Sequence, residues 1–407
     1  MRIKIFLHLC IIMILLGFLV WRAMTTNHQE PIKIGVLHSL TGSMATIERP
    51  LVDAVTLAVN EINAQGGVLN RPLQLIVADG QSKSIVFAQQ AERLISEEKV
   101  SVIFGCWSSR ARRAVKTVVE AHQHLLFYPL RYEGLEQSPN IIYTGSVPNQ
   151  LIIPAARWAL NKFGKRVYLI GSDYIFPHTA NQIINDFIRI TNGQLLAERY
   201  IASSEQNINQ IMNEIEQLKP DIIMNTIAGN QNLVFFQALA RSSQSATPVF
   251  SFNLTEQEIY HPQLTLIKNH YLAWSYFQSL ANIENRQFVD RYRKQFGRYR
   301  VTSDPIEAAY FDVYLWAQAV NEAKSISPDQ VNITILRQSY HAPSGIVSID
   351  RKTRHTWKML RIAQIQPNRQ IKIVYSSQYP LRPEPFPGYR HQNDWHKLLT
   401  TLINHQK

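Results

Sequence analysis

The sequence predicts an α/β protein of two doubly wound parallel-sheet lobes joined by a hinge and preceded by an N-terminal signal or anchor helix. Three observations lead to this fold class. The chain has 407 residues, which exceeds the usual size of one domain. From Pro31 onward, short apolar runs alternate with helix-length segments, as expected of strands covered on both faces. The alternation restarts after Pro148, so two successive halves are expected.

The first half is predicted to hold four strands and three helices. The first strand is followed by the loop Thr41-Gly42-Ser43, and the helix after this loop ends at Gly66-Gly67. In chain order, the predicted elements lie at residues 32–37, 52–63, 73–78, 86–97, 100–104, 110–121 and 125–128.

The second half repeats the alternation, with predicted elements at residues 154–163, 166–170, 179–191, 195–201, 208–218, 221–226, 232–240 and 248–251. Two long helices are expected at residues 284–296 and 306–323. From Val347 the sequence alternates apolar and polar residues, as a half-buried strand does. It then passes through a Pro-rich segment near residues 379–387.

The N-terminus predicts export from the cytoplasm. Residues 5–21 form an apolar run that is broken only by His8 and preceded by Arg2 and Lys4. The end of the run lacks the small residues of a good cleavage site, which favours an uncleaved anchor over a cleaved signal peptide. We therefore assign residues 1–30 to a signal or membrane anchor with its linker. Both alternatives give a periplasmic or extracytoplasmic body, and the uncleaved helix would tether it to the inner membrane.

Composition and motifs exclude several functional classes. The net charge is +12, but the basic residues are scattered and no DNA-binding motif accompanies them, so we expect no nucleic acid partner. The sequence lacks a nucleophile elbow, a P-loop, a dinucleotide-binding glycine pattern and a zinc-protease motif. We expect no catalytic residues, no metal and no cofactor. Cys106 is the one thiol of the body, because Cys10 lies in the apolar run, so an internal disulfide is excluded there.

The loops that follow the strands are the candidate ligand site. In open α/β sheets the ligand crevice lies beyond the carboxyl ends of the strands, and two facing lobes form a cleft that closes by a hinge motion. The loop after residues 100–104 carries Trp107, Ser108 and Ser109 at the start of a helix. Two alternatives stay open here: the serines only cap the helix, and Trp107 belongs to the core.

Three further loops hold candidate ligand residues. The candidates are Tyr128, Leu130 and Arg131 at and after residues 125–128, Tyr174 and Phe176 after residues 166–170, and Gly229 after residues 221–226. A glycine in such a loop lets the backbone approach a ligand closely.

Several motifs resemble a known family. The stretch I-K-I-G-V-L-H-S-L-T-G-S-M-A from Ile32 resembles the type I periplasmic binding fold, whose best-known members are branched-chain amino-acid-binding proteins. More specific stretches are F-G-C-W-S-S-R-A-R-R at 104–113, F-Y-P-L-R-Y-E-G at 127–134, Y-T-G-S-V-P-N-Q at 143–150 and G-S-D-Y-I-F-P at 171–177. They resemble the branch that holds urea ABC transporter binding proteins and the short-chain amide sensors of amidase operons. The resemblance covers residues 32 to 395.

This resemblance implies the lobe boundaries and the pocket. Lobe I would comprise residues 31–147 and 277–346, and lobe II residues 148–276 and 347–377, with the tail 378–407 packed on both. The pocket residues implied are Trp107, Ser108, Ser109, Tyr128, Leu130 and Arg131 from lobe I, and Tyr174, Phe176 and Gly229 from lobe II.

The resemblance also implies a ligand and a partner. The ligand would be urea, a short-chain amide or an amino acid, delivered to an ABC permease. The alternative is a membrane-tethered sensor that regulates a partner protein. Two departures from the family pattern widen the ligand class: Phe176 stands where a tyrosine is usual, and Arg131 stands where amide sensors have proline and urea binders an amide. Because a guanidinium matches a carboxylate, Arg131 keeps an anionic ligand among the alternatives.

Overall fold

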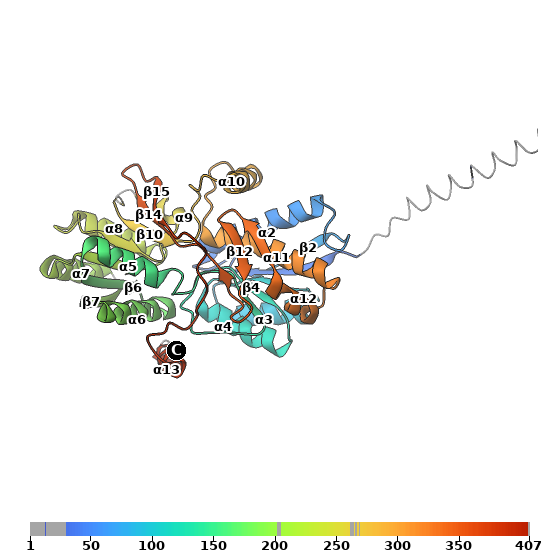
Figure 1. Ribbon diagram of the computed structural model, residues 1–407, viewed down its shortest axis with the longest axis horizontal. Helices are drawn as coiled ribbons and strands as arrows, with labels where there is room; N and C mark the ends of the chain where they lie inside the picture. The colour runs from blue at the N-terminus through green and yellow to red at the C-terminus, as the bar shows by residue number, and fades with distance from the viewer. Residues whose placement is uncertain are drawn as a thin grey trace, which may run out of the picture.

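The computed structural model of the protein describes residues 30–201, 205–260 and 269–405, together with Met13, Leu264 and Ile267. Two α/β lobes lie side by side, each built on its own sheet, and the C-terminal helix lies at the edge between them (Figure 1). The predicted fold class is confirmed. Apart from Met13, the predicted anchor at residues 5–21 falls outside the described residues. No helix in the described part of the chain is both long and apolar enough to cross a membrane.

The first lobe is built on a five-stranded parallel sheet in the order β2-β1-β3-β4-β5. Its elements are β1 (Ile32–His38), α2 (Ala45–Ala64), β2 (Leu73–Asp79), α3 (Ser84–Ser96), β3 (Ile103–Gly105), α4 (Ser109–Ala121), β4 (Leu126–Tyr128) and β5 (Ile141–Tyr143). All seven predicted elements are present. Helix α2 begins at Ala45, five residues before Pro50, whereas the prediction began after this proline.

The second lobe is built on a seven-stranded sheet in the order β15-β14-β10-β9-β8-β6-β7. Strands β6 to β10 pair in parallel, whereas β14 and β15 form an antiparallel hairpin at one edge. The strands are β6 (Arg166–Ser172), β7 (Gln194–Ile201), β8 (Ile222–Thr226), β9 (Val249–Ser251), β10 (Tyr271–Trp274), β14 (Arg361–Ile365) and β15 (Ile371–Ser376). The helices are α5 (Ile152–Phe163), α6 (Ile175–Ile190), α7 (Glu205–Leu218), α8 (Gln231–Arg241) and α9 (Glu256–Ile259).

Later segments return to the first lobe before the chain ends on the second. They are α10 (Ile283–Phe296), α11 (Asp304–Ala323), α12 (Pro328–Thr334), a 3-10 turn (Ile335–Arg337), β11 (Ser339–Ala342), β12 (Gly345–Ile349) and β13 (Thr356–Trp357). Val347 and Ile349 pack in the core of the first lobe, whereas the sequence assigned residues from 347 onward to lobe II. The chain therefore crosses after β13, and α13 (Gln392–His405) follows the tail.

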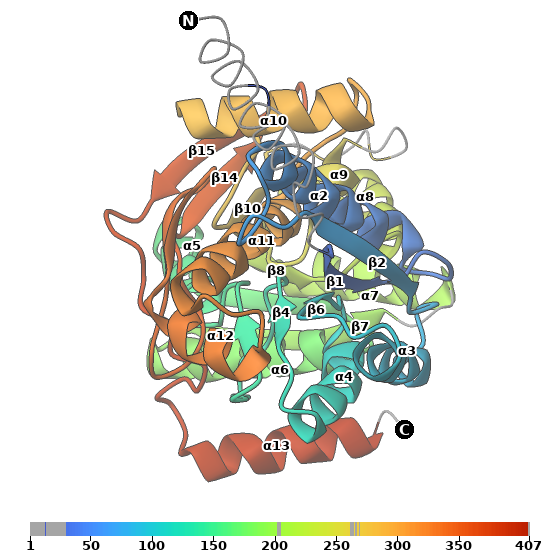
Figure 2. The same ribbon diagram turned by 90° about the vertical axis from the view of Figure 1, so that its right-hand side faces the viewer.

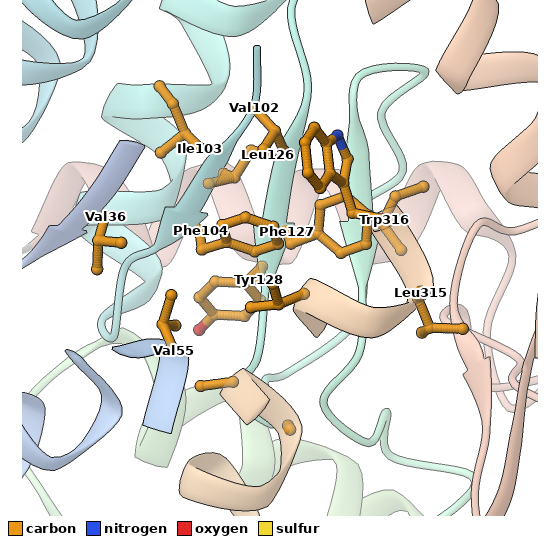
Figure 3. Close-up of a cluster of buried hydrophobic side chains, with 14 of the residues drawn as sticks. Val36, Val55, Val102, Ile103, Phe104, Leu126, Phe127, Tyr128, Leu315 and Trp316 are labelled. Carbon is orange, nitrogen blue, oxygen red and sulfur yellow. The ribbon is translucent and has the colours of Figure 1, made fainter. Parts of the chain in front are cut away.

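Helix α11 completes the core of the first lobe, although it lies far along the chain from the sheet. Figure 3 shows its Trp316 beside Phe104 of β3 and Phe127 of β4. The rings of Trp316 and Phe104 meet edge to face, with centroids 6.3 Å apart. Trp316 and Phe127 are both fully buried, so α11 seals the face of β3 and β4 away from water.

The segments that cross between the two sheets converge on one buried carboxylate. Asp304, at the start of α11, accepts hydrogen bonds from the backbone N–H groups of Ser275 and Tyr276, both at 3.0 Å. Lys358, on the crossing before β14, places its Nζ 3.5 Å from Asp304 Oδ1, and both side chains are buried. Ser146, on the crossing after β5, bonds the Ser275 hydroxyl at 2.9 Å. Hydrogen bonds thus join the three crossing segments to one another at the hinge.

Glu256 of α9 makes stability depend on pH. The carboxyl group is buried, its Oε2 accepts the Gln278 N–H at 2.9 Å, and its Oε1 has no partner. Burial raises the pKa of Glu256 to about 8. The folded chain therefore holds this proton up to about pH 8, whereas the unfolded chain releases it near pH 4.5, so the contribution to stability falls as pH rises through that window.

Between about pH 5 and pH 8, the free energy of unfolding of the unmodified chain should fall. We expect this fall to be smaller by about 2 kcal/mol or more in Glu256→Gln, because the amide stays neutral. Urea unfolding at the two pH values measures it. Glu97→Gln, at an exposed position, is the control and should leave the pH dependence unchanged. Identical pH profiles for Glu256→Gln and the unmodified chain would contradict the assignment.

Candidate functional site

The loops after β4 and β9 meet where the two lobes face each other. Arg131, three residues after β4, donates from Nε to the carbonyl oxygen of Phe252, which directly follows β9, at 2.9 Å. The Arg131 side chain thus spans from one lobe to the other. The contact lies beyond the carboxyl ends of the parallel strands in both sheets, where the ligand crevice of such sheets is expected.

The Arg131 guanidinium is buried among aromatic rings. Its central carbon lies 4.1 Å from the ring centroid of Phe176 and 5.0 Å from that of Trp274, both in the second lobe. Only 4% of the residue is exposed. Burial lowers the pKa of Arg131, and electrostatic interactions with Tyr174, Tyr128, Asp304 and Glu258 partly oppose this shift. Within the described residues, Arg131 forms no ion pair, and Nε is its one hydrogen-bonding nitrogen.

Two predicted tyrosines stand near this cation. Tyr174 directly precedes α6, and its hydroxyl oxygen accepts a hydrogen bond from Asn253 Nδ2 at 2.9 Å, which leaves the hydroxyl proton to donate. Tyr128 ends β4 and donates to the carbonyl oxygen of Trp107 at 2.8 Å within its own lobe. Burial raises the pKa of Tyr174, and the charge of Arg131 opposes that shift. Leu130 is buried beside Arg131.

The serine loop after β3 is engaged within the first lobe. Ser108 is the N-cap of α4, and its hydroxyl oxygen accepts the Ala111 N–H at 3.1 Å, as the capping alternative expects. Ser109 donates to Glu133 Oε2 at 2.6 Å. Trp107 is buried in the core of the first lobe. The two serine hydroxyls thus already have protein partners. A ligand role for these three residues stays a prediction.

Ser109 belongs to a buried ion network that the sequence did not predict. Arg112 is fully buried and lies 3.3 Å from Glu133 and 3.0 Å from Glu136, while Lys116 lies 3.8 Å from Glu136. Burial opposes ionisation of Glu136, but the charges of Arg112 and Lys116 outweigh it and lower its pKa to about 2. A signal was visible: Ser109, Arg112 and Lys116 share one face of α4 by their spacing.

Gly229 lies in the loop between β8 and α8, with a positive φ of 62° that favours glycine. Nothing lies within 4 Å of the position that a Cβ atom would take. Its carbonyl oxygen accepts the Asn232 N–H at 3.0 Å, which starts α8. The structure therefore places Gly229 in a turn of the second lobe, without a contact to Arg131.

Three residues that contact Arg131 or Tyr174 were missed. Phe252 and Asn253 directly follow the predicted strand at residues 248–251, so applying the loop argument to that strand too would have found them. Trp274 ends β10, a four-residue strand that the sequence did not predict. Together with Phe176 and Tyr174, these residues surround Arg131 with rings and one hydroxyl donor, an arrangement suited to a planar anionic solute.

Comparison with known proteins places this geometry in context. Residues 32–392 match the family model described as a periplasmic binding protein domain. Leu/Ile/Val-binding protein homolog 4 of Brucella melitensis is 21% identical over 358 residues, 82% of this chain and 84% of that protein. Limonene hydroxylase of Geobacillus stearothermophilus is 31% identical over 116 residues, so the match spans 28% of this chain and 21% of that protein.

Solved structures show the same fold. A solute-binding protein of an ABC transporter from R. palustris, in complex with 4-hydroxybenzoate, has a TM-score of 0.78 at 21% identity, covering 87% of this chain and 98% of that one. The branched-chain amino acid transporter substrate-binding protein of Streptococcus pneumoniae, in complex with isoleucine, has a TM-score of 0.74 at 19% identity, covering 87% and 100%.

Proposed function

Because the chain belongs to the periplasmic binding protein domain family, we propose that it is an extracytoplasmic solute-binding protein that closes two lobes around a small solute and delivers it to an ABC importer. The relatives that match over most of their length support this: one is named a Leu/Ile/Val-binding protein, and two are substrate-binding proteins of transporters. A non-catalytic role is consistent with the absence of catalytic motifs from the sequence.

The solute that fits best carries a carboxylate. The observation that supports it is Arg131, a buried cation without an ion-pair partner among the described residues, positioned between the two lobes. Burying an unpaired charge is costly, and a bidentate carboxylate would neutralise it through the guanidinium nitrogens that have no partner among the described residues. The Phe176 and Trp274 rings beside it suit an aromatic or aliphatic acid, and the solved relatives bind 4-hydroxybenzoate and isoleucine.

Urea and short-chain amides are the second ligand class, proposed from the motif resemblance. They require uncharged donors and acceptors, but the hydroxyls of Ser109 and Tyr128 already donate to Glu133 and to the Trp107 carbonyl. Tyr174 retains a proton to donate. The geometry therefore favours acids over amides.

A thermal-shift screen tests the ligand class. A ligand that binds only the folded state raises Tm. At a concentration of 100 times its Kd, it adds about 2.7 kcal/mol to the free energy of unfolding. The panel contains benzoates, branched-chain amino acids, urea, formamide and acetamide. We expect the largest rise with an acid; a rise with amides and none with any acid would overturn the carboxylate assignment.

The ligand found in this screen is then used to distinguish transport from sensing. The transport proposal expects the liganded protein to stimulate ATP hydrolysis by an ABC importer in a reconstituted membrane. The tethered-sensor alternative expects instead that ligand changes binding to a non-transport partner. Stimulation by ligand-loaded protein, absent with ligand alone, favours transport over sensing.

A further inference from the structure

The loop after β9 carries a buried asparagine that contacts the candidate site. Asn253 directly follows Phe252, and only 4% of the residue is exposed. Its Nδ2 lies 2.9 Å from the hydroxyl oxygen of Tyr174 and 3.2 Å from the carbonyl oxygen of Thr226, the last residue of β8. The two hydrogen atoms of this one amide nitrogen therefore have one acceptor each.

The Thr226 carbonyl determines which way the Asn253 amide faces. A carbonyl oxygen carries no proton, so turning the amide oxygen toward it would place two acceptors in contact. Thr226 is fully buried, and such a contact away from water would be costly. The nitrogen side of the Asn253 amide therefore faces both neighbours, and Tyr174 is the acceptor in its bond with Asn253.

The proton of the Tyr174 hydroxyl is consequently directed away from Asn253. A tyrosine hydroxyl has a single proton, and this one has no acceptor in the described part of the chain. Burial raises the pKa of Tyr174, so the hydroxyl keeps its proton at neutral pH. Tyr174 thus presents a hydrogen-bond donor, and its accepting side is occupied.

The residue before Asn253 holds the second donor of the site. The Phe252 carbonyl oxygen accepts from Arg131 Nε at 2.9 Å, so both Nη atoms of Arg131 are without a hydrogen-bond partner among the described residues. Arg131 belongs to the first lobe and Phe252 to the second, so this contact requires the two lobes to face each other. Closure therefore brings the Arg131 guanidinium to the loop that already orients Tyr174.

The loop itself is fixed within the second lobe. Its next residue, Leu254, accepts a hydrogen bond from Trp274 Nε1 at 2.8 Å. Thr255 and Glu258 form a capping box at the start of α9, and Glu258 also accepts from Asn232 Nδ2 of α8 at 3.0 Å. Figure 2 shows α9 beside α8. Because these bonds hold the loop in place, little ordering is needed when a solute binds.

We propose that Asn253 is a positioning residue that sets the specificity of the cleft: by donating to Tyr174, it commits this hydroxyl to donate to the solute. The inference rests on the proposed function, since it makes Tyr174 the second donor, beside Arg131, to one acceptor group of the solute. A carboxylate offers only acceptors and satisfies both donors, whereas a solute group that has to donate there meets another proton. Asn253 has this effect without touching the solute.

A double-mutant cycle between Asn253 and Tyr174 tests the inference on the full chain. Calorimetric titration gives Kd for the tightest-binding acid of the benzoate and branched-chain amino-acid panel and for its primary amide. Tyr174→Phe removes the donor and should weaken acid binding about 10-fold or more, because a hydrogen bond to a charged group is lost. Asn253→Leu, a substitution of similar volume, should weaken it about 5- to 10-fold, because the Tyr174 proton can then turn away from the solute.

The combination of the two substitutions separates positioning from a structural role. In the Tyr174→Phe background, Asn253→Leu should weaken acid binding by less than about 2-fold more, because no hydroxyl is left to orient. Asn185→Leu is the matched control: it replaces another buried asparagine of the second lobe, about three turns along α6 from Tyr174, and should leave Kd within about 2-fold. Urea unfolding checks that each variant folds, and Asn253→Ala replaces Asn253→Leu in the cycle if the leucine variant does not.

The outcomes distinguish this inference from the carboxylate proposal. If Asn253→Leu leaves acid affinity unchanged, or weakens it equally with and without the Tyr174 hydroxyl, the role of Asn253 is overturned and the carboxylate proposal stands. If the unmodified chain binds the amide and not the acid, the carboxylate proposal fails. The cycle then uses the amide, whose oxygen also accepts the Tyr174 proton: non-additive losses support the role of Asn253, and additive losses overturn it.

Discussion

Arg131→Met is expected to weaken binding of the best acid from the ligand screen by at least about 100-fold, since a charge-assisted bidentate contact is lost from a dry site. The same variant should leave the ligand-free chain as stable as before, or more stable. In that state Arg131 is a buried cation with no ion-pair partner within the described residues, and replacing a buried charge with an apolar side chain is often neutral or stabilising. Loss of binding without loss of stability separates a ligand contact from a structural one.

Calorimetric titration and urea unfolding measure the two effects. Arg131→Lys is the conservative comparison: it keeps the charge but cannot form the planar two-nitrogen contact, so we expect intermediate affinity. Phe176→Leu removes the ring beside the guanidinium and should have a smaller effect than Arg131→Met. Unchanged affinity in Arg131→Met would exclude Arg131 from the ligand site.

Arg112→Met is expected to lower the free energy of unfolding by about 3–5 kcal/mol, because it leaves the buried carboxylates of Glu133 and Glu136 without their main cation. Arg110→Met, two residues earlier on an exposed position of the same helix, should change stability by less than about 0.5 kcal/mol. Urea unfolding at pH 7 gives both values. A loss below about 1 kcal/mol for Arg112→Met would contradict the network.

The pH dependence provides a second check on this network. The folded pKa of Glu136, about 2, lies below its unfolded value near 4.5, so its stabilisation is complete above about pH 4.5 and is lost as pH falls toward 2. In Arg112→Met the acid-induced loss should become smaller, since the main cause of the lowered pKa is removed. An unchanged acid profile would assign the stabilisation to other groups.

The order of the elements could be predicted from the sequence because buried parallel strands are predominantly apolar. Strand β1 shows this most clearly, with six of its seven residues buried. The missed strands were short: β5, β10, β11 and β13 have three, four, four and two residues, too few to establish a pattern. The crossing after β13 was also misplaced, because the alternation at Val347 identifies a half-buried strand but not the core against which it packs.

The candidate site was predicted in part. The motif loops identified Arg131, Phe176 and Tyr174, which the structure brings together, but the partners Phe252 and Trp274 lie more than 100 residues along the chain from Arg131. The Ser109 hydroxyl, a candidate ligand contact, has a protein partner for a physical reason. Glu133 is fully buried and needs donors, so it takes the Ser109 hydroxyl that the loop pattern assigned to a ligand. Local sequence does not show which polar groups a distant buried charge will occupy.

The most direct measurement compares the Kd of the best acid with that of its primary amide, a neutral ligand of nearly the same shape. The Arg131 guanidinium lies between the lobes and forms no ion pair in the described part of the chain. It therefore predicts that the acid binds at least about 10-fold more tightly, and that Arg131→Met abolishes this preference. An amide that binds as tightly as its acid, or more tightly, would contradict the account that a carboxylate completes the buried charge of Arg131.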